Sequence, residues 1–350
     1  MRAVILAGGE GTRLRPLTLS LPKPIVPVVD RPFLRHQLDL LAGAGVRDVV
    51  FCVAYRPEQV EAVFGDGRDH GVRIRYAVED VPLGTGGAVK NALPLLDERT
   101  VVLNGDVLTD LDLAAVVARH EKERAAATIV LTPVPNPAAY GLVETDDEGR
   151  VLRFLEKPRP EEIRTNTINA GVYVLETRVL ELMPAGVTYS IERGFFPALL
   201  ARGDRVLGPV HEGYWIDIGT PEKYLQVHRD ILAGRFAVAL EAERRAGGWA
   251  HPTARIATEA VLEAPFYVGP GCRVEAGAHV GPDAVLVADV EVGRGARVRD
   301  SVVWAGTTIG PLAEVEGSLL GPGVRAGRSS RLRGAALGEG TVLSDFSRTS

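Results

Sequence analysis

A glycine-rich turn near the start of the chain carries the clearest chemical signal. The apolar run 2–7 leads into the sequence GGEGTR at residues 8–13, and the sequence PKP follows at 22–24. A buried strand that ends in such a turn brings backbone N–H groups close to a phosphate. Arg13 adds a rigid fork of donors, and Lys23 adds a second cation on a backbone stiffened by its two proline neighbours. The turn therefore predicts a site for phosphate groups.

Two familiar phosphate motifs are excluded by the same residues. A P-loop requires a lysine and a Ser/Thr at the end of its glycine frame, where this chain has Arg13 and Leu14. The dinucleotide fingerprint requires a third glycine, which is missing after Gly9 and Gly11. A plain tight turn is the remaining alternative, and Arg13 together with the later PKP sequence argues against it.

Two carboxylates far apart in the sequence are candidates for binding a metal ion. Asp106 follows the apolar run 100–104, and Asp217 lies in the sequence WIDIGTPEKY at 215–224. Mg²⁺ typically takes one or two protein carboxylates together with phosphate oxygens. The alternatives are that Asp106 only caps the following turn and that Asp217 only opens a helix that starts near Pro221.

The elements that must position these residues alternate between strands and helices. Valine-rich runs at 48–53 and 100–104 are typical of strands buried on both faces of a sheet, and amphipathic stretches at 33–42 and 57–64 predict helices. This alternation predicts a Rossmann-like α/β domain with a doubly wound mixed sheet over residues 1–235. Ligands of such sheets bind beyond the carboxyl ends of the strands, where both the turn at 8–13 and Asp106 fall.

The pattern changes after Phe236. We expect a linker helix over 236–249, because this stretch is polar and rich in alanine. From Ile256 to Trp304 an aliphatic or aromatic residue recurs at every sixth position, with Gly and Pro between. Such a hexapeptide repeat is typical of a parallel β-helix in which every sixth side chain stacks inward. The sequence therefore predicts a β-helix domain over 250–350.

Composition excludes several other classes of protein. The net charge of −5 does not favour nucleic acid as a partner. The two cysteines, Cys52 and Cys272, lack the spacing of a disulfide framework or a zinc site. The sequence shows neither a signal peptide nor an apolar run of membrane-spanning length, so we expect a cytoplasmic protein with no membrane partner.

Three motifs in order point to a known family. The sequences LAGGxGTRLxP at 6–16, PKP at 22–24 and WxDxGTP at 215–221 together resemble the sugar-1-phosphate nucleotidyltransferases. The resemblance implies transfer of a nucleotidyl group from an NTP to a sugar 1-phosphate, with Mg²⁺ as cofactor, giving an NDP-sugar and pyrophosphate. GTP and mannose 1-phosphate are the best single prediction. The alternatives are a glucose-1-phosphate thymidylyl- or uridylyltransferase and a non-catalytic regulatory relative.

The resemblance also assigns roles to single residues. The reaction needs no general base, because the sugar phosphate oxygen is already ionised and the main obstacle is repulsion between anions. Arg13 is then expected to bind the leaving pyrophosphate, and Lys23 the α-phosphate or the sugar phosphate. Asp106 and Asp217 are the expected metal ligands. The nucleotide-binding residues that the family implies are Leu6, Ala7, Gly8, Gly9, Gly11, Thr12, Glu79, Gly84 and Thr85.

Glu79 bears on the choice of nucleotide. It stands where relatives specific for thymidine or uridine nucleotides often carry Gln. A carboxylate only accepts hydrogen bonds, and guanine offers two adjacent donors on its pairing edge. Uracil and thymine offer one donor between two carbonyl oxygens, which a carboxylate would repel. Glu79 therefore favours GTP, and the alternative is that its side chain faces solvent.

A group of later segments resembles the family's sugar site. A ligand rich in hydroxyl groups needs both donors and acceptors at fixed positions. The expected sugar-phosphate-binding residues are Gly141, Glu156, Lys157, Asn169 and Glu192. The segment around Glu192 departs from the usual family pattern by its glycine at position 194.

The repeat domain resembles the left-handed β-helix that follows several nucleotidyltransferases. Some of these domains are acyltransferases that use a histidine base, for which His251 and His279 are the candidates in this chain. Nothing around them resembles an acyl-carrier pocket, so a platform for oligomerisation or regulation is the favoured prediction. We accordingly expect a homo-oligomer.

Overall fold

The computed structural model describes residues 1–349, and their contacts form two compact units. Unit 1 comprises Met1–Gly9 and Leu34–Trp215, and unit 2 comprises Glu10–Phe33 together with the chain from Ile216 onward. The units thus differ from the contiguous blocks 1–235 and 250–350 expected from the sequence. The reason is that residues 10–33 and 216–235 pack with the C-terminal coils.

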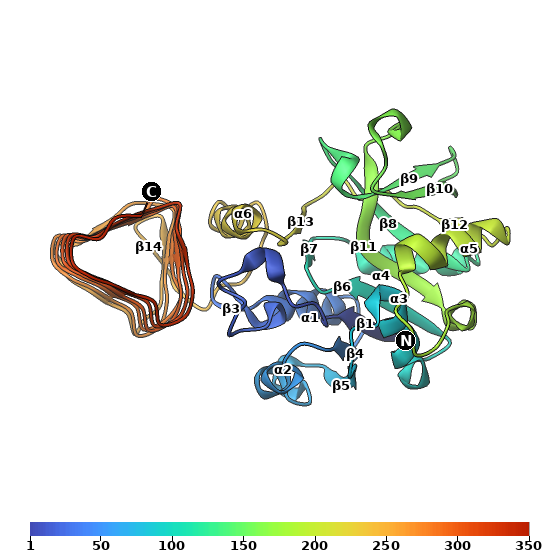
Figure 1. The fold of residues 1–350 in the computed structure, drawn as a ribbon, viewed down its shortest axis with the longest axis horizontal. Helices are drawn as coiled ribbons and strands as arrows, with labels where there is room; N and C mark the ends of the chain where they lie inside the picture. Colours follow the sequence, from blue (N-terminus) through green and yellow to red (C-terminus); the bar gives the residue numbers. More distant parts are fainter. Residues whose placement is uncertain (350) are drawn as a thin grey trace. The chain divides into compact units, whose positions relative to one another are not determined.

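Unit 1 is built on one nine-stranded sheet. Its strands are β1 (Arg2–Leu6), β4 (Asp48–Val53), β5 (Arg73–Val78), β6 (Arg99–Asn104), β8 (Ala127–Pro133), β9 (Gly141–Thr145), β10 (Val151–Glu156), β11 (Thr167–Glu176) and β12 (Val206–Leu207). They follow the order β10-β9-β11-β6-β1-β4-β5, with β8 beside β11 and β12 beside β8 (Figure 1). Strand β1 is parallel to both β4 and β6, whereas β11 is antiparallel to its neighbours. The predicted doubly wound mixed sheet is therefore confirmed.

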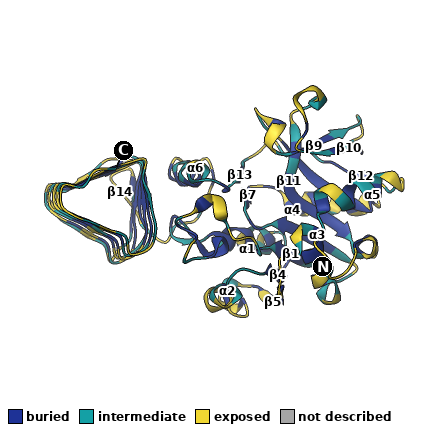
Figure 2. Ribbon diagram, in the orientation of Figure 1, coloured by how far each residue is buried: buried dark blue, intermediate teal, exposed yellow. Residues whose placement is uncertain are grey.

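Helices separate the parallel strands, as the alternating sequence pattern predicts. They are α1 (Phe33–Gly43), α2 (Pro57–Phe64), α3 (Gly84–Ala92), α4 (Leu113–Lys122) and α5 (Phe196–Ala201). The apolar side chains of the central strands are almost completely buried, as the dark β1, β6 and β11 of Figure 2 show. This burial on both faces explains why these strands read as continuous runs of Val, Ile and Leu.

Unit 2 contains the segment 10–33, one long helix and a stack of coils. The helix is α6 (Pro221–Leu232), and the segment 10–33 holds the short strands β2 (Pro27–Val28) and β3 (Arg31–Pro32). The short strand β7 (Val107–Thr109) belongs to unit 1, and β13 (Trp215–Asp217) spans the point where the chain passes from unit 1 to unit 2. Thr220 caps α6 by accepting a hydrogen bond from the backbone of Lys223, and Pro221 occupies the first helical position, where its fixed φ suits the helix.

The C-terminal coils form a left-handed parallel β-helix whose turns superimpose as a triangle in Figure 1. Its strands are β14 (Glu243–Arg245), β15 (Gly248–Ala250), β16 (Arg255–Ile256), β17 (Val261–Leu262), β18 (Phe266–Val268), β19 (Arg273–Val274), β20 (His279–Val280), β21 (Ala284–Leu286), β22 (Glu291–Val292), β23 (Arg297–Arg299), β24 (Ser301–Val303), β25 (Thr308–Ile309), β26 (Glu314–Glu316), β27 (Leu319–Leu320), β28 (Arg325–Ala326), β29 (Arg331–Arg333), β30 (Ala336–Leu337) and β31 (Val342–Leu343). The first face carries β14, β15, β18, β21, β24, β27 and β30; the second carries β16, β19, β22, β25, β28 and β31; the third carries β17, β20, β23, β26 and β29.

The inward stack follows the predicted period of six only as far as Val298. The next buried core position is Val303, because the coils shorten by one residue from there, as in the pairing of Leu286 with Val303. The prediction that Trp304 stacks inside the β-helix is therefore wrong. Its indole instead donates a hydrogen bond of 3.1 Å to the hydroxyl of Tyr224 on α6.

The predicted linker helix over 236–249 is also wrong. Residues 237–240 have no regular structure, and β14 and β15 form an antiparallel pair that starts the first coil. Helix propensity is overridden here by strand pairing, which is reinforced by the guanidinium of Arg244 at 4.0 Å from the ring centre of Trp249.

Helix α6 packs on the first face of the β-helix within unit 2. Arg229 donates two hydrogen bonds of 2.7 Å to the carboxylate of Asp300. The outward column Tyr267, Val285 and Val302 is buried, unlike the outward columns of the other two faces. The first face is therefore a packing surface.

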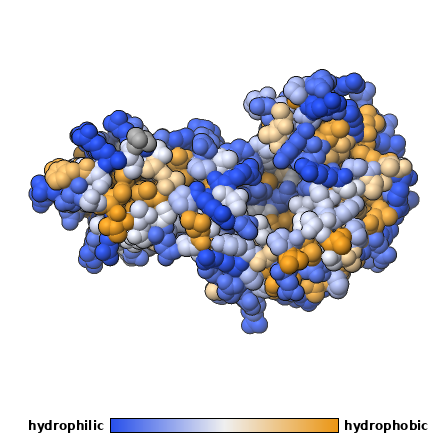
Figure 3. Space-filling view, in the orientation of Figure 1, coloured by the Kyte–Doolittle hydropathy of each residue, from blue (hydrophilic) through white to orange (hydrophobic). Residues whose placement is uncertain are grey.

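No helix among residues 1–349 combines the length and apolar character needed to cross a membrane. Figure 3 shows hydrophilic residues over much of the visible surface, with apolar residues interspersed.

Candidate active site

In unit 1 the ends of three neighbouring strands bring the glycine-rich turn close to Asp106. The backbone N–H of Ala7 bonds to the carbonyl of Cys52 at 2.8 Å, and that of Gly105 bonds to the carbonyl of Leu6 at 2.9 Å. A Cβ on Gly105 would overlap this Leu6 carbonyl oxygen, so only glycine permits the approach. Asp106 consequently begins directly beside the end of β1.

Glu79 lies at the same edge of the sheet and does not face solvent. Glu79 is 7% exposed, and its Oε2 accepts a hydrogen bond of 2.8 Å from the backbone N–H of Leu83. A Cβ added to Gly8 would lie 3.6 Å from the other oxygen, Oε1. Burial raises the pKa of this carboxyl group, and the bond from Leu83 opposes the shift. Glu79 therefore holds the turn before α3 and borders the glycine-rich turn.

Thr85 connects the start of α3 to Glu192. Gly84 has φ of +70°, which allows the tight approach of the Tyr189 carbonyl. The hydroxyl of Thr85 donates to Glu192 Oε2 at 2.8 Å and accepts from the backbone of Ile191 at 3.0 Å. The expected nucleotide segment and the expected sugar segment thus share a hydrogen-bond network.

Glu192 lies on a π-helical turn, Ile191–Phe195. Ser190 donates a second hydrogen bond to its Oε2 at 2.7 Å. The glycine at 194, which departs from the family pattern, makes room for the ring of Tyr189, since a Cβ there would lie 2.5 Å from the ring carbon Cζ. Tyr189 was missed by sequence reasoning because its contacts with Gly84 and Gly86 on the distant helix α3 form only in the folded chain.

Two more expected sugar residues face each other across the β9–β10 pair. Gly141 is paired with Glu156, and a Cβ at Gly141 would lie 2.9 Å from Glu156 Oε2. Burial raises the pKa of Glu156, and the nearby charge of Glu192 raises it further, while Arg193 and Lys157 act in the opposite direction. The structure therefore brings Glu156 and Glu192 into electrostatic contact.

Asn169 is held by local hydrogen bonds on β11. Its amide donates to the hydroxyl of Tyr173 at 2.8 Å, and its Oδ1 accepts from the backbone of Gly171 at 2.9 Å. Trp215 donates to the carbonyl of Ala170 at 2.9 Å, next to these residues in sequence. Lys157 has φ of 53° at the end of β10. The aromatic partners at 173 and 215 were not predicted as site residues.

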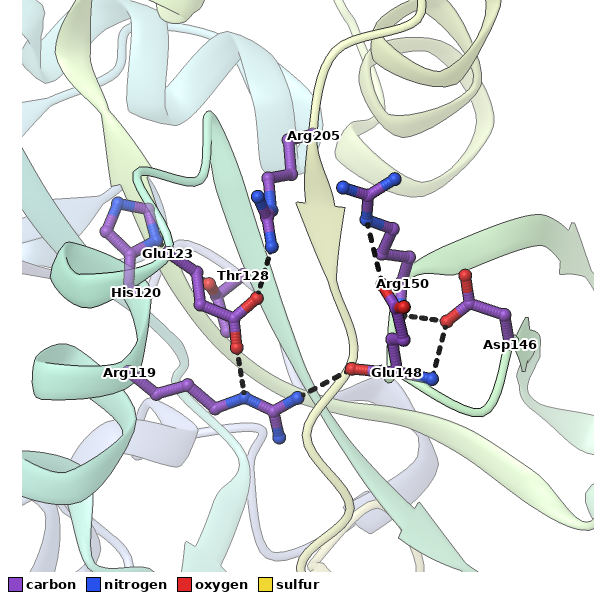
Figure 4. A network of polar contacts seen from close by, with 8 residues as sticks. All are labelled: Arg119, His120, Glu123, Thr128, Asp146, Glu148, Arg150 and Arg205. Atoms are coloured by element: carbon purple, nitrogen blue, oxygen red, sulfur yellow. Dashed lines mark hydrogen bonds and ion pairs between the residues drawn. The ribbon is translucent and has the colours of Figure 1, made fainter.

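A polar network fixes the β9–β10 hairpin to α4 (Figure 4). Arg119 on α4 donates to Glu123 at 3.1 Å and to the carbonyl of Glu148 at 2.9 Å. Arg205 donates to the same Glu123 at 2.6 Å, and the bonds from both arginines lower the pKa of Glu123. Because Glu148 lies in the hairpin turn, this network restrains the strands that carry Gly141 and Glu156.

In unit 2 the structure brings Arg13 beside the segment that follows Asp217. A Cβ added to Gly219 would lie 2.7 Å from Nη2 and 2.9 Å from Cζ of Arg13. Arg13 stands in a short 3-10 turn, Thr12–Leu14, whose preceding Gly11 has φ of +63°. Arg13 and Gly219, which are 206 positions apart in the sequence, thus meet within one unit.

Lys23 is buried and is therefore not a solvated surface lysine. It is 8% exposed and belongs to the 3-10 turn Lys23–Ile25. Thr18 donates a hydrogen bond of 2.8 Å to the carbonyl of Gly11, and a Cβ at Gly11 would lie 3.1 Å from Cβ of Lys23. At Gly9, in contrast to Gly11, an added Cβ would have no other atom within 4 Å.

Asp217 is the last residue of β13 and forms an ion pair with Lys223 on the first turn of α6. The alternative that Asp217 opens this helix is not supported, because Thr220 is the capping residue. Lys223 was missed by sequence reasoning, although its position six residues after Asp217 in the motif could have drawn attention to it.

The candidate metal ligands are carboxylate oxygens, which suit a magnesium ion, but the described side chains do not form a complete metal-binding cage. Within residues 1–349 no group of three or more His, Cys, Asp or Glu residues is arranged to hold a metal. Asp106 and Asp217 are the candidate carboxylates of the sequence, and Mg²⁺ commonly combines such ligands with substrate phosphates. Asn104 Oδ1, two residues before Asp106, is buried without a hydrogen-bond partner among the described residues, which adds an oxygen of the type that hard cations prefer.

Comparisons with known proteins identify relatives of both parts of the chain. A family model described as nucleotidyl transferase matches residues 2–234, and one described as the GMPPB C-terminal domain matches residues 262–347. The chain is 42% identical over 289 residues to a mannose-1-phosphate guanylyltransferase of Mycobacterium tuberculosis, covering 82% of this chain and 79% of that protein.

Two other relatives are more distant. The chain is 33% identical over 321 residues to a UTP–glucose-1-phosphate uridylyltransferase of Synechocystis, covering 87% of this chain and 83% of that protein. Among solved structures, HddC from Yersinia pseudotuberculosis complexed with GMP-PN has a TM-score of 0.56 and 30% identity, covering 65% of this chain and 97% of that chain.

Proposed function

Because the chain belongs to the nucleotidyl transferase family, we propose that it transfers the guanylyl group of GTP to mannose 1-phosphate, giving GDP-mannose and pyrophosphate. The names of its guanylyltransferase relatives support the choice of substrates. The observation that carries the proposal is the contact between Arg13 and the Asp217–Gly219 segment, which joins the two most specific motifs of the sequence.

The chemistry follows from the charges of the substrates. An oxygen of the sugar phosphate forms a bond to the α-phosphorus of GTP, and the bond to the bridging oxygen of the β-phosphate breaks, releasing pyrophosphate. Arg13 and Lys23 offset the repulsion between the two anions, Arg13 at the leaving pyrophosphate and Lys23 at the α-phosphate or the sugar phosphate. Asp106 and Asp217 would hold Mg²⁺, which when bound supplies further positive charge to the phosphate oxygens.

The remaining site residues recognise the two substrates. Glu79 accepts hydrogen bonds from guanine, and its burial next to the glycine-rich turn supports this role. The other proposed nucleotide contacts come from Leu6, Ala7, Gly8, Gly9, Gly11, Thr12, Gly84 and Thr85. The proposed sugar-phosphate contacts come from Gly141, Glu156, Lys157, Asn169 and Glu192.

We retain three further proposals. Residues 1–235 act as the catalytic domain and 250–350 as a β-helix domain, which the matched ranges 2–234 and 262–347 support. The protein is cytoplasmic, and the free, buried thiols of Cys52 and Cys272 fit a reducing compartment. It forms a homo-oligomer through the β-helix.

Pyrophosphate release with each of the four NTPs, Mg²⁺ and either mannose or glucose 1-phosphate tests the function. We expect kcat/KM to be highest for GTP with mannose 1-phosphate. Replacement of Glu79 by Gln should reduce the preference for GTP over UTP by about tenfold or more, because guanine loses a charged acceptor. Glu58→Gln, an exposed change on α2, is the matched control and should leave the preference unchanged. Dominant turnover of UTP with glucose 1-phosphate would instead identify a glucose-1-phosphate uridylyltransferase. Absence of turnover with every pair of substrates would favour a non-catalytic regulatory relative.

A substitution at Gly219 tests the placement of Arg13. Gly219→Ala puts a methyl group against the guanidinium, whose flexible end can move, so the protein should keep its melting temperature. Displacing this charge should lower kcat by about tenfold to a hundredfold. The methyl group of Gly43→Ala on α1 would enter open space, so this variant serves as the control in the same assay. An unchanged kcat for Gly219→Ala would remove Arg13 from the reaction.

A further inference from the structure

A groove on the β-helix, within unit 2, concentrates arginine side chains. It has a volume of about 680 Å³ and lies over the second face, at the strands β16 and β19. Its charged lining residues are Arg245, Arg255, Arg273, Arg294 and Glu275. None of them belongs to the candidate active site.

Strand pairing places two of these arginines one above the other. Arg255 is the register partner of Arg273, so the two side chains project from adjacent coils, which are about 4.8 Å apart in a parallel sheet. Further along the same outward column stand Glu291, Thr308 and Arg325, so only the first two coils place arginines directly above one another. Arg245 reaches the groove from the β14–β15 hairpin.

Most of this positive charge is not compensated by the protein. Among the described residues Arg245, Arg255 and Arg294 form no ion pair, and Arg273 has only an exposed pair with Glu291 at 3.4 Å. The carboxylate of Glu275 accepts a hydrogen bond of 2.9 Å from the backbone N–H of Arg294, so it is partly engaged by the main chain. The chain from Glu243 onward carries as many acidic residues as arginines, so the groove is a local excess in a balanced domain.

We propose that this groove binds a small molecule that carries at least two phosphate groups. Arginine forks match phosphate oxygens in geometry and charge, and a stacked pair one coil apart suits neighbouring phosphates. The volume falls in the range of small-ligand sites, about 300–1,000 Å³, and is small for a polymer. Ala257 and Ala276, which are both partly exposed, also line the groove and offer a small apolar contact for the rest of such a ligand.

Isothermal titration with inorganic pyrophosphate tests the groove. The full-length protein should bind it at a site that Arg13→Ala leaves intact, so this binding is separable from the proposed active site. In the double variant Arg255→Gln/Arg294→Gln the affinity of that site should fall by about tenfold or more. Turnover of this variant without added pyrophosphate should equal that of the wild type.

Arg325→Gln/Arg348→Gln is the matched control, because it removes two exposed arginines of the same β-helix outside the groove. It should bind pyrophosphate as the wild type does, and both double variants should keep the wild-type melting temperature. Equal affinity in the groove variant would overturn the proposal. Equally strong binding of citrate would assign the groove to carboxylates, and tight binding of an oligonucleotide with weak binding of pyrophosphate would assign it to a polymer; either result would also overturn it.

Discussion

Asp106→Ala is expected to abolish turnover, with kcat reduced by about a thousandfold or more. The proposed magnesium ion would lose one of two protein carboxylates, and its charge acts directly on the reacting phosphates. Folding should be little affected, because Asp106 is only half-buried and the adjacent hydrogen bond to Leu6 is made by the backbone of Gly105. We expect the free energy of unfolding to change by less than about 1 kcal/mol.

The measurement is pyrophosphate release over a range of magnesium concentrations, together with thermal unfolding. Asp106→Asn keeps the size of the side chain and one oxygen, so any residual activity should require more magnesium than in the wild type. Asp147→Ala removes the same charge from an exposed hairpin position and should behave as the wild type. Full activity of Asp106→Ala would exclude Asp106 from the metal site.

Arg13→Ala should lower kcat by about a thousandfold, comparable to the loss of an arginine that stabilises a transferring phosphoryl group. Arg13→Lys keeps the charge but not the planar fork, so it should recover only part of this loss. The side chain is exposed and lies against the backbone at Gly219, so stability should not depend on it.

Steady-state kinetics of both variants separate binding from chemistry. A change confined to KM would indicate that Arg13 binds the nucleotide equally in ground and transition states, contrary to its proposed role at the leaving group. Arg15→Ala, which removes an exposed arginine paired with Glu10, is the neighbouring control. It should retain the wild-type kcat.

The sequence was most informative where chemistry restricts both residue type and position. The strands before the glycine-rich turn and before Asp106 were predicted within a residue of their ends, because fully buried strands need continuous apolar runs. The sequence also assigned roles in one reaction to Arg13 and to the distant WxDxGTP motif, but the contact between Arg13 and Gly219 became visible only in the structure.

The errors arose where distant packing outweighed local preference. The alanine-rich stretch before the coils pairs as strands rather than as a helix, because β15 offers it a partner. Trp304 matches the period of six but lies outside the core, since a one-residue shortening of the coil is invisible in composition. The partners Lys223 and Tyr189 depend on side-chain contacts that only the folded chain reveals.

The segment of this protein that bears Lys23 is bonded to its C-terminal coils through one side chain. Within unit 2 the hydroxyl of Tyr224 donates to the carbonyl of Pro27 and accepts from the indole of Trp304, so a single side chain ties the segment that bears Lys23 to the coils. A shortened chain that stops after α6 would retain every motif residue of the family and yet lose the coils to which this segment is bonded. What looks in the sequence like an appended module is therefore part of the support of the segment that bears Lys23.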